Sequence, residues 1–451
     1  MSEEKKEMIT ETTQQPEVEQ NKEKESHSHH SRHHNHSHHH HSHHRSHGSS
    51  KSKKWRRIKR FFRKNKKRLI NVLICFLIVG ALIFMAIRQD AVIKKQEEIS
   101  NHIEMTDSTI RIESTLFVKQ PSVVADGVAV YMDKNNNQDA DAIYNSTKNQ
   151  FPQGSAAIPV EYSYDVVGLP AGVQVNSGVL EVAEKGDFTK PLRFQVIGQG
   201  GKLELTNLKS GTKYNYRLTL MLSNNTTTGT LGEFTTKVSP RFLQIDGLRN
   251  VRDIGGWKTQ NGKTVKQGML YRGIELDGAV ESTFRLTPTG LSTMVDTLGI
   301  RYDMDLRSST VNVNKTDALG ETVVHKYYPV SYYADFFNPA DKETVRKIFS
   351  DLSNKNNYPV YMHCTYGRDR TGTVCYLLQG LLGVSKEDAS KEYSLTVFSG
   401  LNIDKQGFAK LEAAVEDFRG STFQEKVENY LISIGVTRGE INSIREIFLG
   451  E

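Results

Sequence analysis

The distribution of apolar and polar residues divides the chain into four stretches. Residues 1–50 carry almost no apolar side chains, so they cannot bury enough surface to offset their chain entropy, and we expect them to be disordered. Residues 69–87 are nineteen consecutive residues without a charge. Apolar runs separated by turn residues follow from about 116 to 238, which predicts strands. From 241 onward apolar runs alternate with helical patterns, which predicts an α/β domain.

The uncharged stretch, LINVLICFLIVGALIFMAI, is long enough to cross a membrane, because a bilayer core of about 30 Å needs roughly 20 helical residues. Residues 51–68, directly before it, hold twelve Lys or Arg and no acidic residue, which is unusual beside a buried core helix. We therefore expect a transmembrane helix over 69–87, a cytoplasmic tail over 1–68 and an extracytoplasmic location for the rest. A cleaved signal peptide is excluded, because its charged leader would be too long and no A-x-A site follows. Residues 88–115 are predicted to form a stalk that begins as a helix.

The charge balance argues against a nucleic-acid partner. The formal net charge is +7, yet residues 241–451 hold 26 basic and 27 acidic side chains, so the excess lies in the block before the membrane stretch. A nucleic-acid-binding protein carries its basic patch on a folded module. The basic block therefore indicates contact with a membrane surface. The chain has three cysteines, and one of them, Cys75, lies in the membrane stretch, so there is no disulfide framework.

Thirteen histidines lie within residues 26–47. Neutral imidazole is a common metal ligand, so this tract could bind a metal ion. The alternative is a solvated low-complexity tail, and the sequence leaves both open. A purification tag fits less well, because serines and arginines interrupt the run.

The strands predicted over 116–238 favour an all-β sandwich. Their runs include AAIPVEYSYDVV, GVLEVA, KLELTNL and YNYRLTLML, broken by Gly, Asn and Ser. The segment LTNLKSGTKYNYRLTL, followed by GEFTTK, resembles the last strands of a fibronectin type III domain, where a leucine, a turn and a tyrosine recur at this spacing. The resemblance implies a fibronectin type III-like domain over 116–238, and another kind of β-sandwich is the alternative.

One loop of the α/β region stands out. YPVYMHC, residues 358–364, is predicted to be a buried strand, and TGTVCYLLQGLLGVS is predicted to be a helix that begins near Thr371. The connecting CTYGRDRT thus lies at the carboxyl end of a strand and the amino end of a helix. Open α/β sheets bind their ligands at this edge.

The residue types of this loop suit phosphate chemistry. Backbone N–H groups of a tight loop and a helix start form a cradle for an anion, and Gly367 and Gly372 let the backbone approach closely. Arg370 can bind a phosphate through two parallel hydrogen bonds. The same positive field favours the thiolate of Cys364, which would attack phosphorus and form a cysteinyl-phosphate that water hydrolyses. The hydroxyl of Thr371 could donate to the sulfur as it leaves.

Cys364, five residues and Arg370 form the C-x5-R motif of the cysteine-dependent protein tyrosine phosphatase superfamily, which this region resembles. It is similar in particular to the bacterial secreted tyrosine and lipid phosphatases with the loop HCxxGKDRTG. NVRDIGG at 250–256, LYRG at 270–273 and MDLRSS at 304–309 are similar, in order, to that branch's N-F-R-D-L-G-G, Y-R-S and D-L-R-S segments. The resemblance covers about 210 residues and implies a phosphate-binding loop made of Thr365, Tyr366, Gly367, Arg368 and Gly372.

Two positions depart from that branch. Arg368 replaces the usual lysine, a cation that in related phosphatases helps to bind phosphoinositide headgroups, and a planar guanidinium does not substitute freely for an ammonium group. Tyr366 stands where a small residue is usual and could wall the pocket. Both departures favour phosphotyrosine over phosphoinositide as the substrate.

The residues around the loop have more than one reading. We expect His363 to orient the loop through hydrogen bonds, Arg307 to make a structural contact, and Cys375 to be a core residue, with a redox role as the alternative for Cys375. Arg252 and Asp253 could form a structural ion pair or contact the loop, and the sequence leaves this open.

Two aspartates compete for the role of general acid. Asp369 lies inside the loop, and the HCxxGKDRTG branch is thought to use this aspartate. Asp335 lies in SYYADFFNPADKE, an aromatic-rich segment near the place where many superfamily members keep a mobile acid loop. The stronger motif agreement around Asp369 favours Asp369.

The sequence thus predicts a membrane-anchored, extracytoplasmic phosphatase of phosphomonoesters with a tyrosine-phosphatase-like α/β domain over 241–451. Its expected partners are a phosphorylated protein or a small phosphomonoester, and its chemistry needs no metal or organic cofactor. A phosphoinositide or sugar-phosphate phosphatase is one alternative. A surface adhesin or phosphate-binding module without turnover is another.

Overall fold

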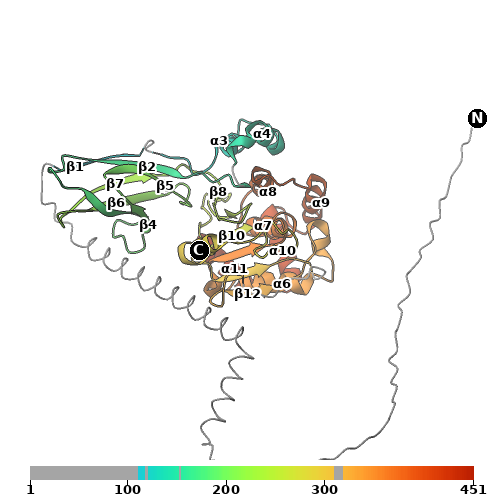
Figure 1. Cartoon of the computed structure of the whole chain (residues 1–451). Coiled ribbons are helices and arrows are strands. Elements are labelled where there is room, and N and C mark those ends of the chain that lie inside the picture. The colour runs from blue at the N-terminus through green and yellow to red at the C-terminus, as the bar shows by residue number, and fades with distance from the viewer. Residues whose placement is uncertain (1–109, 117–119, 152–153, 309–317, 451) are drawn as a thin grey trace, which may run out of the picture. The chain divides into compact units, whose positions relative to one another are not determined.

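The computed structural model describes residues 110–116, 120–151, 154–308 and 318–450 (Figure 1). The predicted tail, the membrane span 69–87 and the helical start of the stalk lie outside these residues. None of the helices within the described ranges is both long and apolar enough to cross a membrane.

The N-terminal strands of the described chain are β1 (Arg111–Leu116), β2 (Val160–Val167), β3 (Val175–Ala183), β4 (Leu192–Val196), β5 (Gly200–Leu205), β6 (Lys213–Leu222) and β7 (Thr227–Thr235). The later strands are β8 (Arg241–Phe242), β9 (Arg252–Asp253), β10 (Leu270–Gly273), β11 (Tyr302–Asp305), β12 (Val324–Tyr327) and β13 (Val360–His363). The helices are α3 (Asp126–Met132), α4 (Ala140–Thr147), α5 (Pro288–Ser292), α6 (Lys342–Leu352), α7 (Asp369–Leu381), α8 (Lys386–Ser394), α9 (Lys405–Glu416), α10 (Phe423–Ser433) and α11 (Arg438–Leu449).

Strands β1 to β7 form two antiparallel sheets, ordered β1-β2-β5 and β4-β3-β6-β7. The apolar and polar residues of β6 alternate, so every second side chain is buried. Tyr216 of β6 meets Tyr162 of β2 with 5.3 Å between ring centroids, so the two sheets touch through buried aromatic rings. The backbone N–H of Lys209 donates to the hydroxyl of Tyr214 (2.8 Å), which pins the turn before β6. The fibronectin type III resemblance itself stays a prediction.

This region differs from the prediction in two respects. Strand β1 pairs with β2 along Arg111–Leu116, so sheet structure begins inside the segment predicted as a stalk. In addition, α3 and α4 lie between β1 and β2, where an all-β pattern was expected. The sequence of α4, ADAIYNST, buries Ala140 and Ile143 on one helical face, and Asp139 caps it by accepting from the N–H of Asp141 (3.1 Å).

The C-terminal region is built on a six-stranded sheet with the order β12-β11-β13-β10-β9-β8. Strands β10, β13, β11 and β12 are parallel, whereas β9 and β8 join antiparallel. Side chains of β13 alternate between two buried clusters: Val360 and Met362 belong to one and Tyr361 to the other. The mixed sheet flanked by helices confirms the predicted α/β class.

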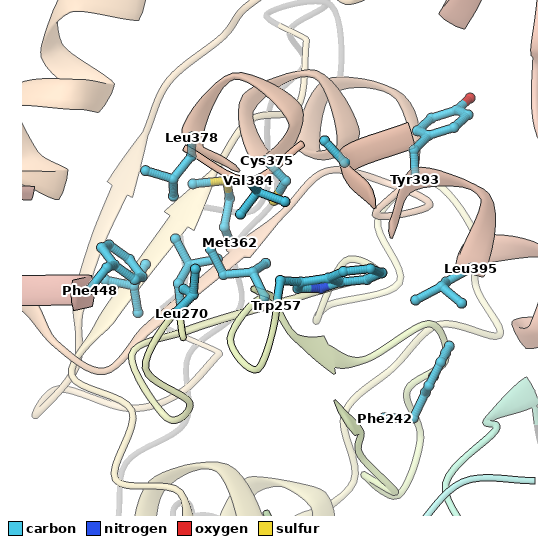
Figure 2. Close-up of a cluster of buried hydrophobic side chains, with 14 of the residues drawn as sticks. Phe242, Trp257, Leu270, Met362, Cys375, Leu378, Val384, Tyr393, Leu395 and Phe448 are labelled. Carbon is cyan, nitrogen blue, oxygen red and sulfur yellow. The ribbon is translucent and has the colours of Figure 1, made fainter. Parts of the chain in front are cut away.

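Helix α7 packs its buried side chains on the first of these clusters. Figure 2 shows Cys375 and Leu378 of α7 together with Met362 of β13 and Val384. The helix begins at Asp369, two residues earlier than the sequence predicted. Strand β13 and helix α7 therefore fix both ends of the connection between them. We call this connection, together with the first two residues of α7, the 364–370 loop.

Candidate active site

The 364–370 loop leaves the middle of the parallel strands. β13 lies between β11 and β10, and Cys364 is the first residue beyond its carboxyl end. Cys364 is only 2% exposed and Thr365 is 8% exposed, so the thiol lies at the bottom of the loop. The structure places the predicted nucleophile at the edge of the sheet where ligands bind.

Two glycines allow the tight course of the backbone. Gly367 has a φ of +60°, and a Cβ there would lie 2.1 Å from the carbonyl oxygen of Gly273. A Cβ on Gly372 would lie 2.8 Å from the ring of Tyr393. Any larger residue at either position would push the loop away from its support.

Buried arginines hold the loop from behind. Arg272 is fully buried, and it donates to the carbonyl oxygen of Gly367 (2.7 Å) and to the carboxylate of Glu392 (2.5 Å). Arg252 donates to the same carboxylate (2.6 Å). Asn250 donates to the carbonyl oxygen of Tyr366 (3.0 Å). The loop carbonyls are thus bound by the domain itself.

The charges of this support do not balance. Arg252 and Arg272 are both buried cations, and Glu392 is the one carboxylate that both contact. Burial raises the pKa of Glu392, but the two guanidinium charges outweigh burial and lower the pKa below its ordinary value. Burial and the charge of Arg272 lower the pKa of Arg252 to about 10. Two cations share one anion beneath the loop, which favours an anion bound within it.

Several donors of the loop have no protein partner. Among the described residues, none accepts a hydrogen bond from the backbone N–H groups of residues 365–371. Arg370 donates through Nε to the carbonyl oxygen of Val330 (2.9 Å) and lies over the ring of Tyr332, and its two terminal nitrogens have no hydrogen-bond acceptor in the described chain. The hydroxyl of Thr371 is fully buried and also unpartnered. Unpaired buried donors are costly, so this group of donors calls for an acceptor such as phosphate.

His363 fixes the first residue of the loop. Its Nδ1 lies 3.3 Å from the carbonyl oxygen of Cys364, and its Nε2 lies 3.2 Å from a carboxylate oxygen of Asp303. Burial lowers the pKa of His363, but Asp303 and Asp305 outweigh burial and raise the pKa to about 9. The imidazolium therefore donates to the carbonyl of Cys364, which is the placement of an orienting residue.

The two candidate acids lie in different surroundings. Asp369 accepts hydrogen bonds from the hydroxyl of Tyr333 and from Nε of Arg368 (2.8 Å). Asp335 is exposed, and its carboxylate forms no hydrogen bond or ion pair with the described residues. Tyr333, which has a φ of +55°, connects the two regions, because its N–H donates to Thr373 of α7 (3.0 Å). Of the two aspartates, Asp369 is the one that lies in the loop and is held there by other side chains.

Arg368 and Tyr366 lie at the rim of the loop. Arg368 binds Asp369 and donates to the carbonyl oxygen of Asn402 (2.5 Å). Its guanidinium carbon lies 5.6 Å from the centroid of the Tyr366 ring. Tyr366 is partly exposed and meets Phe284 edge-on, with 5.7 Å between centroids.

The charged residues near the loop each pair with a residue of the domain. Arg252 and Asp253 do not pair with each other: Arg252 pairs with Glu392 behind the loop, and Asp253 pairs with Arg241 (2.9 Å). Arg307 pairs with Asp305 (2.8 Å), a structural contact of the kind expected.

Cys375 is packed in the core. It is fully buried, among the side chains of Figure 2, and burial raises its pKa to about 12. A thiol with this pKa is protonated at neutral pH, so Cys375 is poorly suited to react.

Sequence reasoning missed four residues of the site. Asn250 and Arg272 lie in the quoted segments NVRDIGG and LYRG, but neither was assigned a role. Glu392 belongs to none of the sequence motifs, and Tyr333 lies in SYYADFFNPADKE, where only Asp335 was given a possible role. The available signal for Glu392 was its position on the buried face of α8, because a buried carboxylate requires a charged or hydrogen-bonding partner.

Comparison with known proteins identifies this region. Residues 243–450 match the sequence model of the tyrosine phosphatase family, so this part of the chain is a tyrosine phosphatase family domain. The predicted family relationship is confirmed at this level. The match does not extend to the β1 to β7 region. It identifies the family and not the narrower bacterial branch with the loop HCxxGKDRTG.

Individual relatives match over shorter lengths. A candidate tyrosine-protein phosphatase of Cupriavidus necator is 26% identical over 181 residues, which cover 34% of this chain and 61% of that protein. A candidate tyrosine-protein phosphatase of Debaryomyces hansenii, OCA1, is 36% identical over 84 residues, which cover 18% of this chain and 40% of that protein. This chain therefore spans less than two thirds of either relative.

Two solved structures are also similar. The core catalytic domain of the PP-IP phosphatase SIW14 from S. cerevisiae, solved with citrate, has 16% identity and a TM-score of 0.25, covering 34% of this chain and 86% of that chain. PTPMT1 in complex with PI(5)P has 14% identity and a TM-score of 0.23, covering 36% and 93%.

Proposed function

We propose that residues 241–451 hydrolyse phosphomonoesters, with phosphotyrosine as the preferred substrate, through a cysteinyl-phosphate intermediate. The observation that carries the proposal is the set of unused donors around one buried thiol. The amides of 365–371, the terminal nitrogens of Arg370 and the hydroxyl of Thr371 lack acceptors in the described chain, and Cys364 is the residue directly before this segment. The family domain supports a phosphoric monoester hydrolase.

Each residue of the loop that we assign to catalysis has its own role in the reaction. The Cys364 thiolate attacks phosphorus, the bond to the ester oxygen breaks, and Asp369 gives that oxygen a proton. Water, deprotonated by Asp369, then attacks the cysteinyl-phosphate and releases inorganic phosphate and the thiolate. Arg370 and the loop amides bind the phosphoryl oxygens throughout. Thr371 donates a hydrogen bond to the sulfur as it leaves.

The two residues at the rim of the loop support phosphotyrosine, rather than a phosphoinositide, as the substrate. Arg368 is engaged by Asp369 and by the carbonyl of Asn402, so it is not a free cation for extra headgroup phosphates. The partly exposed ring of Tyr366 offers a surface on which an aryl group can pack.

The proposal includes the location of the enzyme. The twelve cations before residue 69 and the uncharged stretch 69–87 support a membrane anchor with the catalytic domain outside. The two antiparallel sheets before the domain support a fibronectin type III-like module between them. Protease added to intact cells should then remove the catalytic domain and spare the His-rich tail. Protection of residues 241–451 would reverse the orientation.

The substrate is tested with the full-length chain. Phosphate release is measured from phosphotyrosine peptides, phosphoinositides and sugar phosphates, and we expect the peptides to have the highest kcat/KM. Tyr366→Ala should reduce this preference. Faster turnover of phosphoinositides or sugar phosphates would move the assignment to that class. Phosphate binding without turnover of any ester would indicate a non-catalytic surface module.

A further inference from the structure

The segment between β1 and β2 leaves its sheet and packs on the catalytic domain. Strands β1 and β2 are adjacent and antiparallel, yet about forty residues with α3 and α4 separate them. These residues lie outside the family match, which begins at residue 243. We call residues 120–151 and 154–156 the β1–β2 insertion.

Aromatic side chains of the β1–β2 insertion surround one ring of the catalytic domain. Phe398, which is fully buried, lies 5.4 Å from Phe151 and 5.6 Å from Tyr131 between centroids. Tyr144 meets it edge-on at 6.5 Å. Packing three rings against Phe398 is a large contact for a short insertion, because each aromatic ring contributes substantial apolar area.

Polar contacts extend this interface. Lys405 of α9 lies 2.5 Å from the carboxylates of both Asp139 and Asp141. The hydroxyl of Ser155 donates to the carbonyl oxygen of Leu243 (3.1 Å). The N–H of Asn250, the residue that holds the loop carbonyls, donates to the carbonyl oxygen of residue 154 (3.4 Å).

The segment that carries Phe398 also supports the 364–370 loop. It begins with Glu392, which binds both buried arginines. Thr396 accepts from Arg252 (3.2 Å), and Ser399 donates to Asn250 (3.4 Å). At its far end, the carbonyl of Asn402 accepts from Arg368 of the loop (2.5 Å). Phe398 therefore lies between the insertion and the groups that bind the loop.

We propose that the β1–β2 insertion is a positioning element of the active site, so that the working catalytic unit begins near residue 120 and not at residue 243. The insertion fixes Phe398 and thereby residues 392–402, and these fix Asn250, Arg252 and the loop. The inference rests on the proposed function for its turnover readout, and on phosphate binding alone for a second readout. If the loop amides are displaced by a fraction of an ångström, they bind phosphate less well, and the enzyme hydrolyses its substrate more slowly.

The test replaces Tyr144, which is half-buried and distant in sequence from the loop. In the full-length chain, Tyr144→Ala should lower kcat about tenfold. In a Cys364→Ser background it should weaken binding of inorganic phosphate by a similar factor. Tyr144→Phe keeps the ring and should restore both values. The matched control is Phe188→Ala, which removes a half-buried ring that packs on Arg217 of β6.

A charge exchange gives a second, milder test. Lys405→Glu places a carboxylate against Asp139 and Asp141 and should weaken phosphate binding, and adding Asp139→Lys and Asp141→Lys should restore it. Lys386→Glu breaks the exposed ion pair with Glu416 (2.7 Å) and should have no such effect.

The outcomes separate the two proposals. Wild-type phosphate affinity and kcat in a folded Tyr144→Ala chain would overturn the inference, and so would an equal loss in Phe188→Ala. A wild-type chain that binds phosphate but hydrolyses no ester would overturn the proposed function, while the phosphate measurements would still decide the inference. A wild-type chain that binds no phosphate would overturn both.

Discussion

The buried guanidinium of Arg272 donates a 2.7 Å hydrogen bond to the carbonyl oxygen of Gly367, the residue at which the 364–370 loop turns. This contact binds the carbonyl from behind and leaves the neighbouring amides for a ligand. It also couples the loop to Glu392, 120 residues along the chain from Arg272.

Replacing Arg272 should therefore damage both stability and phosphate binding. In Arg272→Leu, Glu392 loses one of its two cations, and breaking a buried pair costs about 3–5 kcal/mol. We expect a lower free energy of unfolding in urea and weaker inhibition by inorganic phosphate. Arg346→Leu is the control, because Arg346 pairs with Glu343 at the surface, where an ion pair contributes little, so its free energy of unfolding should change little. Equal effects of the two substitutions would contradict the supporting role of Arg272.

The two cysteines of the domain should behave differently. Cys364→Ser should lower turnover by more than about 10³-fold while phosphate still binds, because a hydroxyl is a far weaker nucleophile. Cys375→Ala should leave most of the activity and lower stability, because it opens a small cavity in the core. Steady-state rates and urea unfolding check both variants. Near-normal turnover in Cys364→Ser would sink the mechanism.

The general acid can be identified from the leaving group. An aryl oxide with a high pKa needs a proton as it leaves, which is typically worth 10²–10⁴-fold, whereas an activated ester does not. Asp369→Asn should thus slow phenyl phosphate far more than p-nitrophenyl phosphate, and Asp335→Asn should slow neither. If Asp335→Asn shows the selective loss instead, the acid lies in the segment around Tyr333.

The stability of the domain should fall at alkaline pH because of His363. Its pKa is about 9 in the fold against an ordinary value of 6.5, so the folded state binds the proton more tightly. The stabilisation is complete below pH 6.5 and is lost as pH rises through about 9, with a slope of up to about 1.4 kcal/mol per pH unit. Urea unfolding of wild type and His363→Gln across this range measures it. If the free energy of unfolding of His363→Gln still falls with pH at the same slope, another group binds the proton.

Local features of this chain were predictable, and long-range pairings were not. The strand, the loop and the helix around Cys364 follow from a compact motif, because glycine, arginine and cysteine at these spacings serve one local geometry. The partners Arg272 and Glu392 could not be paired from sequence, because only the packing of α8 behind the loop brings them together. Arg272 and Glu392 lie 120 residues apart, and no periodic pattern in the sequence links them.

Helices α3 and α4 were missed for a different reason. They have seven and eight residues, and such short helices are not stable alone but are held by tertiary packing. Their rings pack on Phe398, far along the sequence, so the local pattern says little about them. The alternation of β6 was visible because its period of two persists over most of its ten residues.

The burial of Cys364 also determines which chemicals can modify it. With 2% of the residue exposed, little of Cys364 is open to a reagent from solution. We therefore expect hydrogen peroxide and small anionic alkylating agents such as iodoacetate to modify Cys364 faster than bulky neutral maleimides. Cys375 is packed away in the core, so a disulfide with it would require that side chain to leave its neighbours. Protection of an oxidised Cys364 by Cys375 would therefore first require the core to open, and without such protection prolonged exposure to peroxide leads beyond the sulfenic acid to irreversible products.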